Sequence, residues 1–392
     1  MIIEPRIREN VCLNAHPQGC LAQVKDQIRY VRQREKIAGP KRVLIIGASN
    51  GYGLAARIVS AFASGAATVG VAYERPPKEK RTASAGWYNN EAFTTLARRQ
   101  GYPVWNLNGD AFANDTKAQV VEQIRQTMGQ VDFLVYSIAA PRRVDPETGE
   151  IHTSVIRPIG QSYTAKTVDF LTGEVREETS YPASPEEVSH TIKVMGGEDW
   201  ALWIEKLLEA ECLASGFQTI AFSYIGPDVT RPIYREGTIG RAKEDLEKRA
   251  KTISSRLAPL SGRAVIGIQK ALVTRASAVI PAVPLYISLL YQVMKAKGLH
   301  ENCIQQIYRL YHDFLFSSPP APPDESGRLR LDDWEMRPDV QAEVAKLWLR
   351  VNNDNIHQLA DLDGFREEFL RHHGFGIAGI DYGQDVDPTR CA

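Results

Sequence analysis

A glycine-rich segment between an apolar run and an apolar-rich helical stretch constrains this chain more than any other feature. Residues 42–46 (Arg-Val-Leu-Ile-Ile) are typical of a parallel strand buried on both faces, and residues 54–62 continue as a helix. The glycines between them permit a tight turn, and a helix N-terminus presents free N–H groups to a pyrophosphate. Turns need glycine in any case, but a strand before and a helix after are the context that a dinucleotide site requires. We assign this site to Gly47, Ala48, Ser49, Asn50, Gly51, Tyr52 and Gly53.

The first 140 residues repeat this alternation of apolar strands and helices. The periodicity predicts further strands at 67–73, 103–107 and 131–137, and helices at 17–39, 89–100 and 114–128. Strand and helix repeated in this way predict an α/β fold with a doubly wound parallel sheet, which is a Rossmann fold.

The regular alternation stops after residue 140. Turn residues at 146–149 and 172–173 lie between β-rich pieces such as 162–169, which predicts one or two inserted hairpins. Beyond them we expect helices at 185–194 and 197–213, strands at 217–222 and 263–268, a helix at 242–257, and C-terminal helices at 338–351, 355–360 and 363–371.

An acidic residue ends the second predicted strand. Glu74 lies about 20 residues beyond the glycine-rich segment, where a carboxylate can bind the adenine ribose hydroxyls and repel a 2′-phosphate. This residue therefore favours NADH, and the neighbouring Tyr73 is also assigned to the cofactor site. An ordinary solvated carboxylate is the alternative, and nearby cations could accept a phosphate instead: Arg75, Lys78, Lys80 and Arg81.

Two further strand ends carry candidate cofactor contacts. Asp110 and Ala111 follow the third strand, where a short acid could hold the adenine amino group. Ile138 and Ala139 follow the fourth strand, where small residues let the backbone approach the adenosine half. Strand ends often carry Asp and Ala for turn reasons, so each contact is a weak signal alone.

A tyrosine and a lysine are candidate catalytic residues. Reductases of this fold commonly use a tyrosine as proton donor, with a lysine whose ammonium lowers the phenol pKa and holds the nicotinamide ribose. Tyr234 and Lys243 are nine residues apart, or about 900° of helix, which would place them on opposite sides. Because Pro232, Gly237 and Gly240 break helix, we expect Tyr234 on a loop and Lys243 in the first helical turn.

Other interpretations of these residues stay open. Tyr224, just past the strand at 217–222, competes with Tyr234 for the donor role. Tyr234 could instead cover an edge of the core, and Lys243 could be a solvated lysine.

Taken together, several segments resemble the FabV-type enoyl-[acyl-carrier-protein] reductases and the similar trans-2-enoyl-CoA reductases of the short-chain dehydrogenase superfamily. The likeness runs through nearly the whole chain, at residues 11–20, 47–53, 73–74, 86–90, 136–141, 234–243 (Tyr-x8-Lys), 270–274 and 283–288. The resemblance implies Tyr234 as proton donor, Lys243 as cofactor ligand and Tyr224 as a substrate contact. It also implies a backbone clamp on the nicotinamide by Leu272, Val273 and Thr274. Two small departures, Asn50 for a common serine and Tyr73 where Phe also occurs, leave the chemistry unchanged.

The resemblance implies that NADH reduces the trans-2 double bond of an enoyl thioester, the last step of the fatty acid elongation cycle. A phenol hydrogen bond from Tyr224 or Tyr234 would stabilise the enolate that forms. The acyl group could be carried by acyl carrier protein or by CoA, and basic patches at 142–143 or 241–249 could receive the acidic carrier protein. A sugar or alcohol dehydrogenase is a more distant alternative. A non-catalytic NADH-binding protein is the alternative from another class.

We expect one enlarged Rossmann domain over residues 1–392. Its parts are an NADH-binding half at 1–140, an insertion near the substrate at 141–213, a catalytic, nicotinamide and acyl region at 214–300, and a helical wrap at 301–392. The uncharged run at 276–294 is about long enough to cross a bilayer, but Pro281 and Pro284 interrupt it. We expect no membrane span there, but a strand-to-helix passage through the core that is either plain packing or the lining of an acyl channel.

Charge and residue counts exclude other classes. The 47 Lys and Arg residues balance 47 Asp and Glu, so the basic excess typical of a nucleic-acid binder is missing. The five cysteines form no CxxC pair and the eight histidines show no metal-ligand spacing, so we expect neither a disulfide framework nor a metal site. The start of the sequence lacks the apolar core of a signal peptide, so we expect a cytoplasmic protein. We also expect a monomer.

Overall fold

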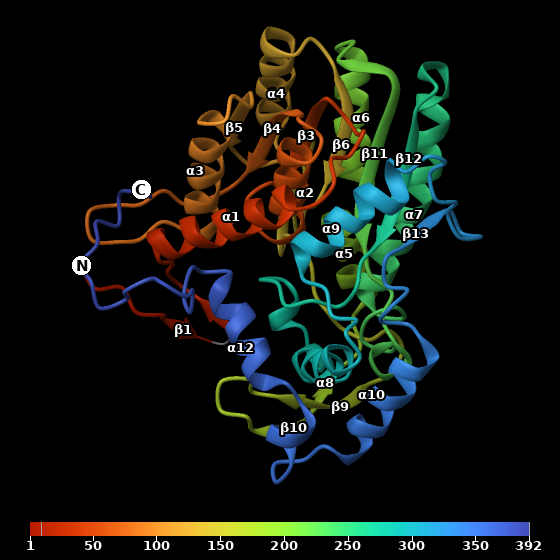
Figure 1. Cartoon of the computed structure of the whole chain (residues 1–392). Helices are drawn as coiled ribbons and strands as arrows, with labels where there is room; N and C mark the ends of the chain where they lie inside the picture. Colours follow the sequence, from red (N-terminus) through yellow and green to blue (C-terminus); the bar gives the residue numbers. More distant parts are fainter. Residues whose placement is uncertain (9, 392) are drawn as a thin grey trace.

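A seven-stranded sheet organises the protein, whose computed structural model describes residues 1–8 and 10–391 (Figure 1). Every neighbouring pair of strands is parallel. Their order across the sheet is β5 (Val104–Asn108), β4 (Ala67–Ala72), β3 (Arg42–Ile46), β6 (Val131–Tyr136), β11 (Leu213–Ser223), β12 (Arg263–Ile268) and β13 (Arg328–Arg330). The order runs outward in both directions from β3 and β6, and this confirms the predicted Rossmann fold.

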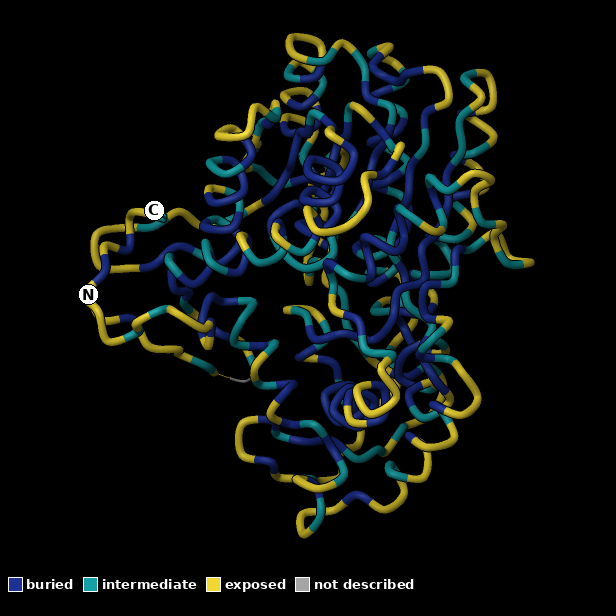
Figure 2. Tube along the Cα trace, viewed as in Figure 1, coloured by how far each residue is buried: buried dark blue, intermediate teal, exposed yellow. Residues whose placement is uncertain are grey.

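Helices cover both faces of this sheet. One face carries α1 (Pro17–Arg32), α2 (Gly51–Phe62), α3 (Ala85–Arg98) and α9 (Cys303–Arg309), and the other carries α4 (Asn114–Thr127), α6 (Glu198–Glu209) and α7 (Thr238–Leu257). Along β3, Val43 and Ile45 pack toward the first set of helices, while Leu44 and Ile46 pack toward the second. Burial on both faces is the reason that this strand is apolar throughout, and Figure 2 shows it inside the molecule.

A second apolar body lies beyond the carboxyl ends of β11 and β12, below the sheet in Figure 1. Its centre is α8 (Val283–Ala296), which packs against the strands and helices around it: β9 (Tyr163–Val168), β10 (Val175–Ser180), α10 (Pro338–Arg350), α11 (Ile356–Leu359) and α12 (Leu362–Arg371). Pro284 lies in the first turn of α8, where its missing N–H costs little. Among the described residues, no helix combines the length and apolar character needed to cross a membrane.

The insertion contains both predicted hairpins. One pairs β7 (Arg142–Val144) with β8 (Ile151–Thr153), and the other pairs β9 with β10. The remaining elements are β1 (Ile7–Arg8), β2 (Val11–Cys12), α5 (Pro185–Met195), the 3-10 turns η1 (Asp228–Thr230), η2 (Ala258–Leu260) and η3 (Ser277–Val279), and the π-helical η4 (Leu310–Leu315).

Three details differ from the sequence-based expectations. The helix expected at 17–39 ends at Arg32, because the chain beyond it turns to bury Ile37, whose N–H donates to the carbonyl of Ala63 (3.2 Å). The run at 276–294 contains no strand, since β12 ends at Ile268 and a short 3-10 turn precedes α8. The region expected to be only a helical wrap, 301–392, also supplies β13 to the main sheet.

Candidate active site

The glycine-rich segment lies between β3 and α2, at the carboxyl edge of the sheet. A side chain at Gly47 would overlap the carbonyl of Ser137 beyond β6, and one at Gly53 would overlap the carbonyl of Gly47. Gly47 also has a φ of +87°, which L side chains rarely adopt. The backbone is therefore packed closely and leaves the N-terminus of α2 uncovered by side chains at these two positions.

Asn50 caps α2 and keeps an unused donor. Its Oδ1 accepts a hydrogen bond from the N–H of Gly51 (3.0 Å), while its buried Nδ2 has no hydrogen-bond partner in the described part of the chain. A buried polar atom without a partner is costly unless something absent from the chain itself pairs with it. This orphan donor at the start of α2 fits the phosphate site predicted there.

Glu74 is held in place beyond the end of β4. Its Oε1 accepts a hydrogen bond from the Ser49 hydroxyl (2.6 Å), and its backbone N–H donates to Asn108 (2.8 Å). Only 9% of its side chain is exposed, and a side chain at Gly86 would overlap Oε1. This carboxylate is thus not an ordinary solvated one, and its Oε2 accepts no hydrogen bond from a described residue. The neighbouring Tyr73 is 80% exposed.

The other predicted adenosine contacts also follow strand ends. Asp110 Oδ1 accepts the N–H of Phe112 (3.0 Å), which is the turn role that we weighed as its alternative. The carbonyl of Ala111 accepts the ammonium of Lys117 (3.0 Å). Ile138 and Ala139 follow β6 after Ser137. The cofactor roles of these four residues stay predictions.

The segment at 270–274 lies beside the glycine-rich segment. The Tyr52 hydroxyl donates to the carbonyl of Lys270 (2.9 Å), and a Cβ at Gly51 would lie 3.9 Å from the Thr274 side chain. At the same edge, the buried side chains of Ser223 and Gln269 have polar atoms without partners among the described residues. These unpaired groups mark a second place where the chain alone does not satisfy its polar atoms.

Most polar backbone groups of the predicted nicotinamide clamp are paired within the chain. The N–H of Val273 donates to the Tyr291 hydroxyl (3.1 Å), and its carbonyl contacts His372 Nε2 (2.7 Å). The N–H of Thr274 donates to the Ser277 hydroxyl (2.8 Å). Of the three residues, Leu272 alone keeps an N–H that donates to no described residue.

The predicted tyrosines lie together beyond β11. Tyr234 and Tyr224 form an edge-on pair with 4.9 Å between ring centres. Tyr234 is 7% exposed, burial raises its pKa, and its hydroxyl has no hydrogen-bond partner in the described part of the chain. The expected lowering of this pKa by an ammonium is therefore wrong for the chain alone, because burial dominates. Tyr224 instead donates its hydroxyl to the carboxylate of Glu335 (2.8 Å).

Lys243 approaches the same strand end from α7. Its Nζ donates to the carbonyl of Phe222 (3.3 Å), and burial lowers its pKa to about 8. Tyr234 precedes the helix, as predicted, but Lys243 lies in the second turn rather than the first. The reason is Gly240: it does not break the helix but lets α7 begin at Thr238, packed against the carbonyl of Arg235.

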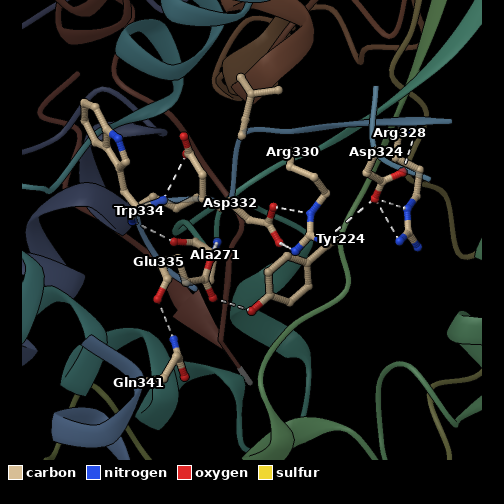
Figure 3. Close-up of polar contacts among 12 residues, drawn as sticks. Tyr224, Ala271, Asp324, Arg328, Arg330, Asp332, Trp334, Glu335 and Gln341 are labelled. Atoms are coloured by element: carbon tan, nitrogen blue, oxygen red, sulfur yellow. Dashed lines mark hydrogen bonds and ion pairs between the residues drawn. The ribbon is translucent and has the colours of Figure 1, made fainter. Parts of the chain in front are cut away.

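Glu335 was missed by the sequence analysis. Its carboxylate is fully buried and binds Tyr224 and the backbone of Ala271 (Figure 3). It also accepts a hydrogen bond from the hydroxyl of Tyr286. In the sequence it is one of several acids at 332–335, and no spacing distinguishes it from Asp332 or Asp333. Only the topology that carries β13 to the sheet edge brings it to the site.

In both basic patches, at 142–143 and 241–249, an arginine is paired with an acidic residue. Arg143 is buried and pairs with Glu198 (2.7 Å), so it cannot form an exposed docking patch, although Arg142 beside it is exposed. On α7, Arg241 pairs with Glu244 at 3.0 Å. A patch at 241–249 is therefore partly neutralised by acids of the same helix.

One group of three described side chains has metal-ligand chemistry. Glu150 Oε1 lies 3.8 Å from His152 Nδ1 and 3.7 Å from His190 Nε2, on β8, its turn and α5. The carboxylate of Glu150 thus lies between the two imidazole rings. We assign no metal to this group, and the predicted absence of a metal site stays a prediction.

Three family models match the chain one after another. The model described as the NAD(P)H binding domain of trans-2-enoyl-CoA reductase matches residues 2–79. The trans-2-enoyl-CoA reductase catalytic region matches residues 81–316. The enoyl reductase FAD binding domain matches residues 323–386.

Curated relatives and solved structures match almost the entire chain. The enoyl-[acyl-carrier-protein] reductase [NADH] of Flavobacterium johnsoniae is 53% identical over 387 residues, covering 99% of this chain and 98% of the relative. That of Opitutus terrae is 53% identical and covers 99% of both chains. The trans-2-enoyl-CoA reductase of Clostridium acetobutulicum in complex with NADH has a TM-score of 0.97 at 45% identity, covering 99% and 98%. The Treponema denticola trans-2-enoyl-CoA reductase with NAD has a TM-score of 0.96 at 48% identity, with the same coverage.

Proposed function

The chain belongs to the trans-2-enoyl-CoA reductase family, and on this premise we propose that it is an NADH-dependent oxidoreductase that reduces the trans-2 double bond of enoyl thioesters. The carrier that we propose is acyl carrier protein, because the two curated relatives at 53% identity are named for it. The reaction is then the last step of the fatty acid elongation cycle.

The position of Tyr234 carries this proposal. Its buried phenol, whose hydroxyl has no hydrogen-bond partner among the described residues, lies beyond the carboxyl end of β11 in the same apolar cluster as α8. A hydrogen-bond donor within an apolar cluster suits a substrate with one polar reacting group on a hydrocarbon chain. The buried and uncharged residues of α8 up to Met294 support our interpretation of 276–294 as a lining for the acyl chain, although core packing explains their burial equally.

The residues at the sheet edge fit NADH. The close-packed glycines and the orphan Nδ2 of Asn50 suit a pyrophosphate at α2. Glu74 Oε2 accepts no hydrogen bond from a described residue, which suits a contact with the adenine ribose hydroxyls. On the nicotinamide side, we propose the N–H of Leu272 as the available contact of the clamp. The unpaired side-chain groups of Gln269 and Ser223 lie nearby, since Gln269 shortly precedes Leu272 in the chain and its N–H donates to the carbonyl of Ser223 (2.9 Å).

Each predicted catalytic residue then has a distinct task. When bound, NADH supplies the hydride that adds to C3 of the enoyl thioester. Tyr234 donates a hydrogen bond to the thioester oxygen, where negative charge develops, and its raised pKa keeps the phenol protonated for that purpose. Tyr234 or a relayed water then protonates C2. Lys243 holds the nicotinamide ribose, and Tyr224 contacts the substrate.

The residues at 323–386 do not fit a second dinucleotide, although one family description names FAD for this region. The helix α12 begins behind Asp361, a carboxylate that accepts the N–H of Gly364 (2.9 Å) and would repel a pyrophosphate. The connection from β13 to α10 contains no glycine. We therefore assign no step to a flavin.

Reduction of enoyl-CoA is the second candidate function, because the solved structures at 45% and 48% identity are named trans-2-enoyl-CoA reductases. The test follows the loss of NADH absorbance with crotonyl-CoA, dodecenoyl-CoA and a carrier-bound enoyl substrate. A higher kcat/KM for the carrier-bound substrate supports the proposal, and a higher value for the CoA thioesters supports the second candidate. NADH binding without turnover of any substrate would indicate a non-catalytic binding protein.

We further propose a single domain that acts in the cytoplasm as a monomer. The single-domain proposal is supported by β13, which extends the main sheet from the C-terminal region. Sedimentation of the purified protein would test the monomer.

A further inference from the structure

A single buried carboxylate connects three parts of the candidate active site. Glu335 Oε1 accepts hydrogen bonds from the hydroxyls of Tyr224 (2.8 Å) and Tyr286 (2.6 Å). Its Oε2 accepts the backbone N–H of Ala271 (2.7 Å). Tyr224 follows β11, Ala271 follows β12, and Tyr286 belongs to α8, so this one group links the substrate side, the nicotinamide side and the apolar body. Figure 3 shows its contacts with Tyr224 and Ala271.

We propose that Glu335 is a positioning residue for the reduction, which fixes Tyr224 against Tyr234 and, with its other oxygen, fixes the start of the segment 271–274. This inference rests on the proposed function. It adds a residue from the C-terminal region to a site whose other proposed members precede residue 295.

The direction of the hydrogen bonds gives the two tyrosines different roles. A carboxylate only accepts hydrogen bonds, so the phenol proton of Tyr224 is directed at Glu335. The hydroxyl of Tyr234 has no such partner among the described residues, and its proton is available to the substrate oxygen. Glu335 therefore fixes the ring of Tyr224 with its centre 4.9 Å from that of Tyr234. In this arrangement Tyr224 does not act as a second proton donor.

The surroundings of Glu335 fix it before substrate arrives. Gln341 Nε2 donates to the Glu335 carbonyl (2.7 Å) and to the Tyr286 hydroxyl (3.1 Å). A carboxylate held at its backbone and at both oxygens can hold other groups within the fraction of an ångström that catalysis needs.

The substitution Glu335→Gln tests this role with almost no change in shape. A glutamine has one acceptor oxygen and one donor nitrogen, so it cannot accept from the tyrosines and from Ala271 at once. Either the two hydroxyls or the Ala271 N–H then loses its acceptor. We expect kcat to fall by about tenfold to a hundredfold, as for a small misplacement of reacting groups, with a much smaller change in the Kd for NADH.

A double-mutant cycle separates positioning from simple destabilisation. If Glu335 acts through Tyr224, E335Q should lower kcat far less in a Tyr224→Phe background than in the wild-type protein, because one interaction cannot be lost twice. Asp332→Asn is the matched control, since it alters a buried carboxylate of the same segment that does not contact the tyrosines. Its effect on kcat should be small and additive with Y224F.

Each outcome bears on the proposal. A folded E335Q protein with wild-type kcat, or full additivity of E335Q with Y224F, overturns the positioning role. If E335Q does not fold by circular dichroism, Glu335→Asp takes its place in the same cycle with the same criteria. A wild-type protein that turns over no enoyl thioester would refute the proposed function instead.

Discussion

Replacing Tyr234 by phenylalanine should stop the reduction while leaving the protein intact. The ring keeps its edge-on contact with Tyr224, and the lost hydroxyl has no partner among the described residues. No buried group is left unpaired, so the free energy of unfolding should change by less than about 1 kcal/mol. The thioester oxygen, however, loses the donor placed where charge develops, which costs about a hundredfold to a thousandfold in turnover.

The assay compares two measurements on the same variant. NADH consumption with dodecenoyl-CoA or a carrier-bound enoyl substrate gives kcat, and quenching of NADH fluorescence gives its Kd. We expect kcat to fall by at least about a hundredfold with a nearly unchanged Kd. Tyr224→Phe is the companion variant, because it removes a hydroxyl of the same ring pair that is already bound to Glu335. Near-normal turnover in Y234F would refute the donor assignment.

Three further predictions concern the cofactor residues. Lys243→Met should weaken NADH binding and lower kcat together. Burial lowers the pKa of Lys243 to about 8, so the NADH affinity of the wild-type protein should decline above that pH. The variant should show no such decline. The unfolded lysine keeps its proton to higher pH, so the contribution of Lys243 to the free energy of unfolding should rise with pH above about 8, measurable as a Tm difference from K243M. Gly53→Ala should abolish NADH binding, because the new Cβ would overlap the carbonyl of Gly47. Gly383→Ala is the control: its Cβ would lie 3.3 Å from the nearest side chain, and this variant should bind NADH normally in the same titration. Glu74→Ala should reduce the preference for NADH over NADPH by about tenfold or more, and an unchanged ratio of kcat/KM values would exclude a ribose contact.

Local signals explain why the first half of the sheet could be predicted. The strand at 42–46 is buried on both faces, so its apolar run is continuous, and Gly47 and Gly53 are required by backbone contacts that any Rossmann turn makes. Tyr234 could be placed outside a helix because Pro232 and Gly237 precede α7. Such signals act within a few residues of each other and can be read from one stretch of sequence.

The remaining features depend on contacts between distant segments. The strand β13 has only three residues, and its pairing with β12 decides that it is a strand at all. Glu335 meets Tyr224 across 111 residues of sequence, so no local pattern marks it. Gly240 was misjudged for a different reason: it packs against the carbonyl of Arg235, a few residues earlier, and this close approach outweighs the low helix propensity of glycine.

The strand β13 also affects what happens when the chain is incomplete. Ile266 and Ile268 of β12 would form an unpaired apolar margin of the sheet if the C-terminal region were missing or not yet folded. The short β13 covers that margin, and its two arginines are held by Asp324 and Asp332 at the outer side. A charged strand of three residues is a poor template for a further strand. Truncation before residue 328 should therefore produce aggregation rather than a smaller active enzyme. The C-terminal region would then keep the protein from aggregating, in addition to contributing Glu335 to the active site.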